Sequence, residues 1–197
     1  NGKKYAFDEE GKMLYGWVSS DNAERVDDTD GDGFKEGDYY FGGEDDGAMT
    51  VGWLQMDITY DEATNDYEIA PVFNDDEDQT RWFYFKANGK KVKAENGDYQ
   101  KEKTINGKKY AFDDEGRMLF GWVAADNAER IDNTDGDGFK EGDYYFGGED
   151  DGAMTVGWLQ MDITYDEATS DYEIAPVFND DEDQTRWFYF KSNGKKV

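Results

Sequence analysis

The sequence has no cysteine, no histidine and only two prolines among its 197 residues. Without cysteine, neither a disulfide framework nor a thiolate metal site can form. Without histidine, the chain lacks the commonest general base and the commonest ligand for transition metals. No apolar run approaches the roughly 20 residues that a membrane-spanning helix requires, so we expect no membrane insertion. The sequence shows no signal peptide and begins inside a repeat, so we expect it to be part of a longer repeat array.

Aliphatic residues are also scarce. Hydrophobic residues make up 37% of the chain and aromatic residues alone 17%, which leaves few Leu, Ile and Val for a conventional core. Large aromatic side chains suit thin, stacked hairpins in which each layer contacts only its neighbours. No Leu/Ala-rich stripe occurs at helical spacing. The composition therefore predicts an all-β protein.

Positive charge is in short supply as well. The chain has 48 Asp and Glu against 21 Lys and Arg, a formal net charge of −27. Phosphate backbones and anionic membranes repel such a surface, so we expect no nucleic-acid partner. Cations, and ligands with an exposed cationic group, are the favoured partners. The alternative is that the charge simply keeps an extended array soluble.

What the sequence does contain is a repeat. When the chain is shifted by 105 residues, 92 positions overlap and nine differ, which leaves 83 identical. We therefore divide the chain into a first copy, residues 1–105, and a second, truncated copy, residues 106–197. Such similarity indicates recent duplication and a repeat array.

A shorter unit occurs three times in each copy. In the first copy, residues 5–17, 39–53 and 82–95 each contain an aromatic strand, a polar turn ending in glycine and a second short strand. The third unit has Lys91 where the others have Met. Because a lone hairpin is marginal in water, successive hairpins must bury surface by stacking. We predict a solenoid-like tandem array of β-hairpins.

Two inserts separate these units. Residues 19–37 form an acidic, glycine-rich loop. Residues 54–80 alternate more regularly, and we predict an additional hairpin there, with strands over 55–60 and 67–73. Pro71 marks an edge strand or bulge, since proline cannot donate to a β-ladder.

The short units carry a recognisable pattern. Residues 82–89 read WFYFKANG, residues 11–17 read GKMLYGW and residues 47–53 read GAMTVGW. This pattern resembles the choline-binding, or cell-wall-binding, repeats of Gram-positive surface proteins and phage lysins. It is also similar to repeats in glucan-binding domains and clostridial toxins. The resemblance implies a hairpin solenoid at the surface of a Gram-positive-type bacterium or outside the cell.

The resemblance also implies a ligand site. In that family, aromatic rings from consecutive hairpins form a cage around the quaternary ammonium of choline, held by cation–π attraction. Here each cage lacks a wall: Asp38 stands where the cage of Trp17 needs a ring, and Ala111 where the cage of Trp53 and Trp82 does. Trp53 with Trp82, repeated as Trp158 with Trp187, is the best candidate site; the alternative is that these rings are core residues. We predict these ligand-binding rings: Trp17, Tyr40, Trp53, Trp82, Tyr84, Trp122, Tyr145, Trp158, Trp187 and Tyr189.

The acidic loop predicts a calcium site. Its oxygen ligands stand at alternate positions before a glycine turn, a spacing similar to the loops of EF-hands and thrombospondin type 3 repeats. The alternative is a solvated acidic loop. The second copy has Asn133 in place of Asp28, so its site should bind calcium more weakly. The predicted ligands are Asp28, Asp30, Asp32, the carbonyl of Phe34 and Glu36, and in the second copy Asn133, Asp135, Asp137, Phe139 and Glu141.

No residue pattern indicates catalysis. Serine nucleophiles have no histidine partner, and no glycine-rich phosphate motif follows a strand. Two functions remain. The first is a non-catalytic cell-surface module that attaches to a cell-wall polymer, choline or carbohydrate through its aromatic hairpins. The second is a calcium-stabilised spacer or stalk of a surface adhesin.

Overall fold

The computed structural model describes residues 2–20, 24–26, 33–58, 60–61, 66–67, 79–94, 103–125, 130–131, 138–148, 150–163, 165–166, 171–172 and 184–197. The chain forms two compact units. Unit 1 is Asn1–Ala94 with Asp114–Met118, and unit 2 is Glu95–Asp113 with Leu119–Val197. The sequence repeat and the compact units thus have different boundaries, because the turn Asp114–Met118 of the second copy belongs to unit 1.

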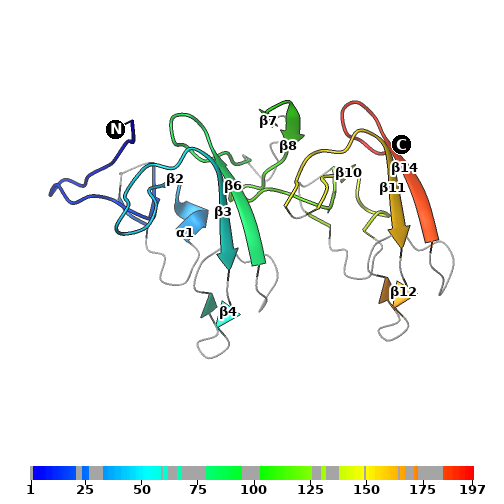
Figure 1. Ribbon diagram of the computed structural model, residues 1–197, viewed down its shortest axis with the longest axis horizontal. Helices are drawn as coiled ribbons and strands as arrows, with labels where there is room; N and C mark the ends of the chain where they lie inside the picture. The colour runs from blue at the N-terminus through cyan, green and yellow to red at the C-terminus, as the bar shows by residue number, and fades with distance from the viewer. Residues whose placement is uncertain are drawn as a thin grey trace. The chain divides into compact units, whose positions relative to one another are not determined.

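Unit 1 is built from short strands and one turn of helix (Figure 1). Two strands are long, and they pair antiparallel with each other. Its elements are β1 (Trp17–Val18), α1 (Gly33–Glu36), β2 (Tyr39–Tyr40), β3 (Gly52–Ile58), β4 (Tyr60–Asp61), β5 (Asp66–Tyr67) and β6 (Gln79–Phe85).

Unit 2 repeats this order of strands, with a turn at residues 138–141 in place of α1, and adds a hairpin before it. That hairpin turns at Asn106 and Gly107, whose φ angles of 50° and 84° suit a two-residue turn with both central residues left-handed. The elements of unit 2 are β7 (Lys103–Ile105), β8 (Lys108–Tyr110), β9 (Trp122–Val123), β10 (Tyr144–Tyr145), β11 (Gly157–Ile163), β12 (Tyr165–Asp166), β13 (Asp171–Tyr172) and β14 (Gln184–Phe190).

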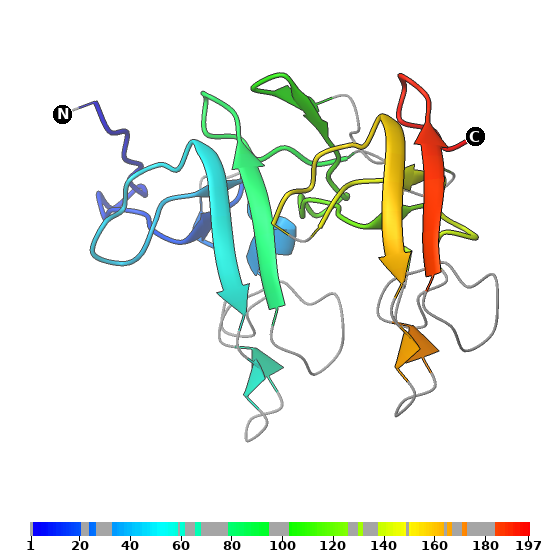
Figure 2. The same ribbon diagram turned by 45° about the vertical axis from the view of Figure 1, so that its right-hand side comes forward.

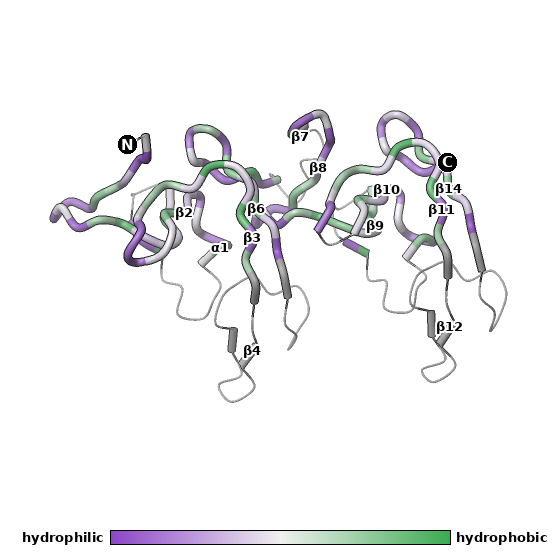
Figure 3. The backbone as a smooth tube through the Cα atoms, viewed as in Figure 1, coloured by the Kyte–Doolittle hydropathy of each residue, from purple (hydrophilic) through white to green (hydrophobic). Residues whose placement is uncertain are grey.

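The predicted all-β hairpin array is confirmed. Every strand pair in the described residues is antiparallel, and each sheet has two strands. The hydropathy of the described residues alternates in short stretches, without a long apolar run (Figure 3). None of the described helices is long and apolar enough to cross a membrane.

The insert over residues 54–80 differs from its prediction. A hairpin does form there, because β4 pairs with β5, Tyr60 with Tyr67 and Asp61 with Asp66. However, residues 52–58 form β3 and pair with β6, so the predicted partnership of 55–60 with 67–73 is wrong for 55–58. This pairing sets Leu54 opposite Phe83, and both then contribute to one core. Residues 68–78, including Pro71, lie outside the described residues.

Successive hairpins are joined in the same way each time. The backbone amide at the Met position of one hairpin donates to a backbone carbonyl at the start of the preceding hairpin. The Met49 amide donates to the Lys4 carbonyl at 2.8 Å, and the Lys91 amide donates to the Asp38 carbonyl at 2.7 Å. The Met13 side chain also packs on Gly47, where an added Cβ would collide with it. These contacts produce the predicted solenoid-like stacking.

Candidate functional site

The long hairpin of each unit pairs β3 with β6 or β11 with β14 (Figure 2). It has two different faces, because successive side chains of a strand point to opposite sides. In unit 1, Trp53 is paired with Tyr84, and Gln55 with Trp82. These four residues form what we call the outer face. The other side, the inner face, carries Leu54, Met56, Phe83 and Phe85.

The rings of the outer face contact one another. The centroid of Trp53 is 5.0 Å from that of Tyr84 and 6.1 Å from that of Trp82, and both pairs meet edge to face. All three side chains are half-buried. The structure thus brings together the two tryptophans predicted as the best ligand site and adds Tyr84 beside them.

The outer face of unit 2 has the same geometry. The Trp158 ring is 5.0 Å from Tyr189 and 6.4 Å from Trp187, again edge to face. Trp158 is 69% exposed, Trp187 59% and Tyr189 43%. Three large rings therefore face solvent on one side of β11 and β14.

Trp17 belongs to the inner side instead. It is 1% exposed and packs against Tyr40 at 5.0 Å, Phe83 at 5.3 Å and Phe85 at 6.0 Å between ring centroids. The insert closes over it, since a Cβ on Gly37 would lie 2.7 Å from the Trp17 ring.

Trp122 occupies the equivalent place in unit 2. It is also 1% exposed, and its centroid is 5.0 Å from Tyr145 and 5.3 Å from Phe188. Burial raises the pKa of Tyr145, with a further contribution from Asp151. The structure places Trp17 and Trp122, both predicted as ligand-binding rings, in the core, where they pack against Tyr40 and Tyr145.

A lysine ammonium lies against the buried tryptophan of unit 1. Lys91 is 1% exposed, and its Nζ donates to the carbonyl of Phe34. The same Nζ is 5.0 Å from the Trp17 ring centroid and 5.8 Å from that of Phe83. Sequence analysis identified this residue only as a lysine in the Met position of the third hairpin.

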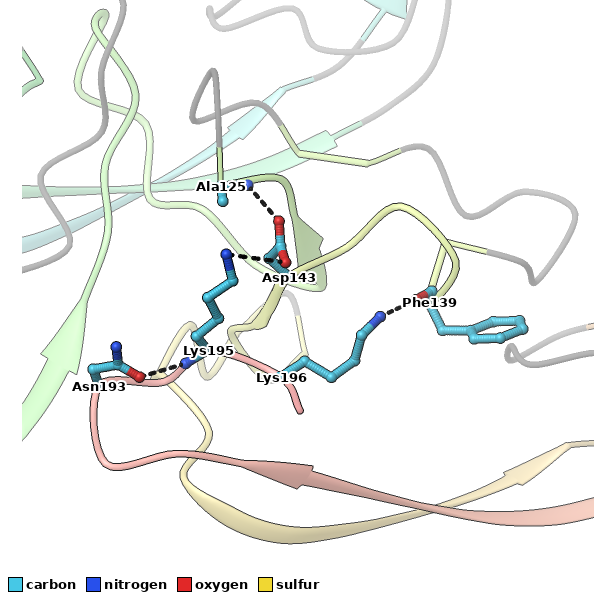
Figure 4. A network of polar contacts seen from close by, with 6 residues as sticks. All are labelled: Ala125, Phe139, Asp143, Asn193, Lys195 and Lys196. Atoms are coloured by element: carbon cyan, nitrogen blue, oxygen red, sulfur yellow. Dashed lines mark hydrogen bonds and ion pairs between the residues drawn. The ribbon is translucent and has the colours of Figure 1, made fainter.

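Unit 2 repeats the arrangement with Lys196 (Figure 4). Its Nζ donates to the carbonyl of Phe139 and lies 5.0 Å from the Trp122 ring centroid. Burial lowers the pKa of Lys196, and the nearby carboxylate of Asp143 opposes that shift.

Asp38, which replaces a cage ring in the sequence pattern, is a buried polar residue of unit 1. It is 7% exposed, accepts a hydrogen bond from Ser20 Oγ at 2.5 Å and lies 3.1 Å from Lys93 Nζ. Burial alone would raise the pKa of this carboxyl; the Ser20 hydroxyl and the Lys93 ammonium outweigh burial and hold the pKa below its ordinary value.

Figure 4 shows the contacts of the equivalent Asp143 in unit 2. Its carboxylate accepts from the Ala125 amide at 3.2 Å and lies 3.7 Å from Lys195 Nζ. Asn193 fixes the turn that carries this lysine, because its side-chain oxygen accepts from the Lys195 amide at 3.1 Å.

The predicted calcium loops are described only in part. Asp28, Asp30 and Asp32, with Asn133, Asp135 and Asp137, lie outside the described residues. Phe34 and Glu36 lie in α1, and Phe139 and Glu141 in the corresponding turn. The two phenylalanine carbonyls predicted as backbone ligands accept from Lys91 and Lys196. Among the described residues, no group of three or more acidic side chains could hold a metal ion. The calcium sites stay a prediction.

Comparison with known proteins finds similarity only among solved structures. No family model and no curated protein matches the chain. Choline-binding protein F from Streptococcus pneumoniae is 20% identical, with a TM-score of 0.47 over 98% of this chain and 38% of that one. A second structure of that protein, determined in the presence of a peptidoglycan analogue, is also 20% identical, with a TM-score of 0.33 over 100% of this chain and 80% of that one.

A truncated alternansucrase from Leuconostoc mesenteroides is 17% identical, with a TM-score of 0.24 over 85% of this chain and 13% of that one. The chain thus spans well under half of the first of these structures and a small part of the alternansucrase. Choline-binding proteins are the group whose repeat pattern the sequence resembles.

Proposed function

We propose that the chain is a non-catalytic repeat module of a bacterial cell-surface protein and that it holds a cell-wall ligand on the outer faces of its long hairpins. The observation that carries this proposal is the cluster of three aromatic rings on each outer face. Trp53 contacts Tyr84 and Trp82 in unit 1, and Trp158 contacts Tyr189 and Trp187 in unit 2, whereas Trp17 and Trp122 lie buried in the core.

Exposed rings in contact with one another support ligand binding for a physical reason. Burial of a large aromatic side chain is strongly favourable, so a folded protein rarely leaves several such rings together in water without a use for them. The edge-to-face contacts of Trp158 with Trp187 and Tyr189 hold the rings in place. Rings held in this way lose little conformational entropy when they bind a ligand.

Two ligand classes fit such a surface. A quaternary ammonium group is attracted to the faces of aromatic rings, and the net charge of −27 raises the local concentration of cations. A sugar ring can stack its apolar face on an indole and needs no charge. Salt separates the two, because added salt screens the long-range attraction of a cation and leaves stacking of a neutral sugar largely unchanged.

The experiment is a titration of the whole chain with choline and, separately, with short glucans, followed by tryptophan fluorescence at low and high salt. The variant that tests the site is Trp82→Ala with Trp187→Ala, which opens both outer faces. The matched control is Phe7→Ala, because Phe7 is 59% exposed and lies on another hairpin. We expect binding by the wild type and the control and at least about tenfold weaker binding by the double variant. Equal binding by all three would contradict the proposal.

A spacer function is the second proposal, and the repeated core supports it. The contact of Trp17 with Phe83 and that of Trp122 with Phe188 have the same centroid distance, 5.3 Å. A unit that reproduces its core so closely can be added or removed without altering its neighbours, as in other repeat proteins. The absence of any response to choline or glucan would favour this function over ligand binding.

A further inference from the structure

Lys91 occupies a position where a charged side chain is unexpected. The equivalent positions of the two preceding hairpins are Met13 and Met49, which pack on a glycine of the next hairpin. Lys91 makes the same contact with its aliphatic stem, since a Cβ on Gly116 would lie 2.7 Å from its Cδ and Cε. The aliphatic part of Lys91 therefore packs as methionine does in the preceding hairpins, so packing alone does not explain its ammonium group.

The surroundings of that ammonium group have the features of a receptor for a cation. The Nζ atom is 5.0 Å from the Trp17 ring centroid and 5.8 Å from that of Phe83, within reach of cation–π attraction. It also donates to the Phe34 carbonyl. The side chain as a whole is 1% exposed, so the rings and the carbonyl replace the water that an ammonium ion normally holds.

The same arrangement occurs in unit 2, as the near-identical sequence of the two copies requires. Lys196 Nζ donates to the Phe139 carbonyl and lies 5.0 Å from the Trp122 centroid. A lysine thus meets a buried tryptophan and a backbone carbonyl at the same point of both copies.

We propose that the site formed by Trp17, Phe83 and the Phe34 carbonyl is an ammonium-binding site whose resident ligand is the Lys91 side chain. When that side chain is removed, the site accepts a free primary alkylammonium ion. The site around Trp122 and the Phe139 carbonyl has Lys196 as its resident ligand in the same way. This inference does not depend on the function proposed for the outer faces.

The carbonyl makes the site selective. A primary ammonium group satisfies both the aromatic rings and the Phe34 carbonyl, since it carries N–H donors. A quaternary ammonium ion satisfies only the rings and leaves the carbonyl without its charge-assisted hydrogen bond. The site around Trp17 should therefore prefer a primary ammonium ion to a quaternary one, although its rings would suit either.

The experiment uses the full chain with Lys91→Ala, a change that removes the atoms of n-propylammonium. We expect the variant to melt at a lower temperature than the wild type and n-propylammonium chloride to raise that temperature in a saturable way, because a ligand that binds only the folded state stabilises it. Tetramethylammonium chloride should bind at least about tenfold more weakly, since it cannot donate to the carbonyl. Neutral 1-propanol, of the same length, should also bind at least about tenfold more weakly because it lacks the charge.

The controls are the wild type and Lys86→Ala, which removes an exposed lysine of the same hairpin. Neither should respond to n-propylammonium beyond the effect of sodium chloride at equal ionic strength. If the three compounds stabilise Lys91→Ala equally, or if Lys86→Ala gains as much as Lys91→Ala, the site has no preference for a primary ammonium ion and the proposal fails.

A second measurement keeps the proposal testable if Lys91→Ala does not fold. In the wild type, a water-soluble acylating reagent should modify Lys91 at least about tenfold more slowly than Lys86, because only a deprotonated and accessible amine reacts. Mass spectrometry of the peptides gives both rates. Equal rates would show that the Lys91 ammonium is not held in the site and would overturn the proposal.

Discussion

The two copies of the repeat agree in their cores and differ in their polar contacts. The distances from Trp17 to Tyr40 and from Trp122 to Tyr145 are both 5.0 Å. By contrast, Asp38 accepts a hydrogen bond from the Ser20 hydroxyl, and the second copy has Ala125 at the equivalent position.

The difference shows which contacts a repeat can lose. The aromatic core is the same in both units, because apolar burial drives its packing and none of the nine differing positions is one of its large rings. The hydroxyl contact depends on a single substitution, because the second copy has alanine at 125 where the first copy has Ser20. A duplicated unit therefore keeps its fold when it loses that hydrogen bond.

The largest expected effect comes from the shared core. Trp17→Ala and Trp122→Ala should each destabilise their unit by about 3–5 kcal/mol, because each deletes a buried indole and leaves a cavity. Trp187→Ala is the control, and its effect should stay within about 0.5 kcal/mol because the ring is exposed. Urea unfolding followed by far-ultraviolet circular dichroism measures all three. If Trp17→Ala and Trp122→Ala differ by more than their errors, the two cores are not equivalent.

Calcium tests the second-largest expected difference. If the acidic loops bind calcium, saturation at about 100 times the dissociation constant stabilises the fold by about 2.7 kcal/mol, and EGTA removes that gain. Asp28→Asn gives the first loop the residue of the second, so it should reduce the effect of calcium. Differential scanning calorimetry with calcium and with EGTA measures the shift. Identical melting curves in both conditions would leave these loops as solvated acidic segments.

The carboxylate at Asp38 provides the next comparison. Asp38→Asn should lower the free energy of unfolding by about 1–3 kcal/mol. The substitution removes the charge of the side chain that Lys93 and the Ser20 hydroxyl contact. Asp143→Asn should cost less than about 1 kcal/mol, because its ion pair is longer and its side chain is 36% exposed. Urea unfolding at neutral pH compares the two variants, and an equal loss would mean that the closer contacts of Asp38 add nothing.

The pH dependence of Asp38 follows from its lowered pKa. A carboxyl with a lower pKa in the folded state stabilises the fold above its unfolded pKa, near 3.8 for Asp, and that contribution is lost as the pH falls through the folded value. The wild type should therefore lose stability more steeply than Asp38→Asn as the pH falls below about 4. Parallel curves would show that Asp38 does not contribute to acid unfolding.

Much of the fold could be predicted from the sequence, because turns and alternation are local. The glycine turns and the aromatic strands follow from short segments such as 82–89. The Asn106-Gly107 hairpin was missed, although this dipeptide is the strongest short-range signal for a two-residue turn. The partner of β3 was assigned wrongly, because pairing across the insert depends on which strands share a core.

The candidate site was predicted less well, for the same reason. The family resemblance predicted Trp53 and Trp82 as one site, and the observed register of β3 and β6 places both rings on one face. No residue near Trp17 in the sequence indicates that the Lys91 ammonium packs against its ring, because Lys91 is 74 positions further along the chain. The sequence pattern thus identifies which aromatic residues belong together. Contacts between residues far apart in the sequence decide which of them are buried.

The smallest expected effect is also the most specific, because it transfers one contact from the first copy to the second. Ala125→Ser places a hydroxyl where Ser20 donates to its carboxylate in unit 1. The new hydroxyl should donate to Asp143 and stabilise unit 2 by about 0.5–1.5 kcal/mol.

Ser20→Ala is the reverse change and should cost unit 1 a similar amount. The double variant Ala125→Ser with Asp143→Asn distinguishes a hydrogen bond from a general effect of serine, since the gain should shrink when the acceptor loses its charge. Urea unfolding of the two single variants and the double variant gives the coupling energy. A coupling near zero would mean that the second copy lacks the backbone geometry for this hydrogen bond, and the two copies would then differ in more than their side chains.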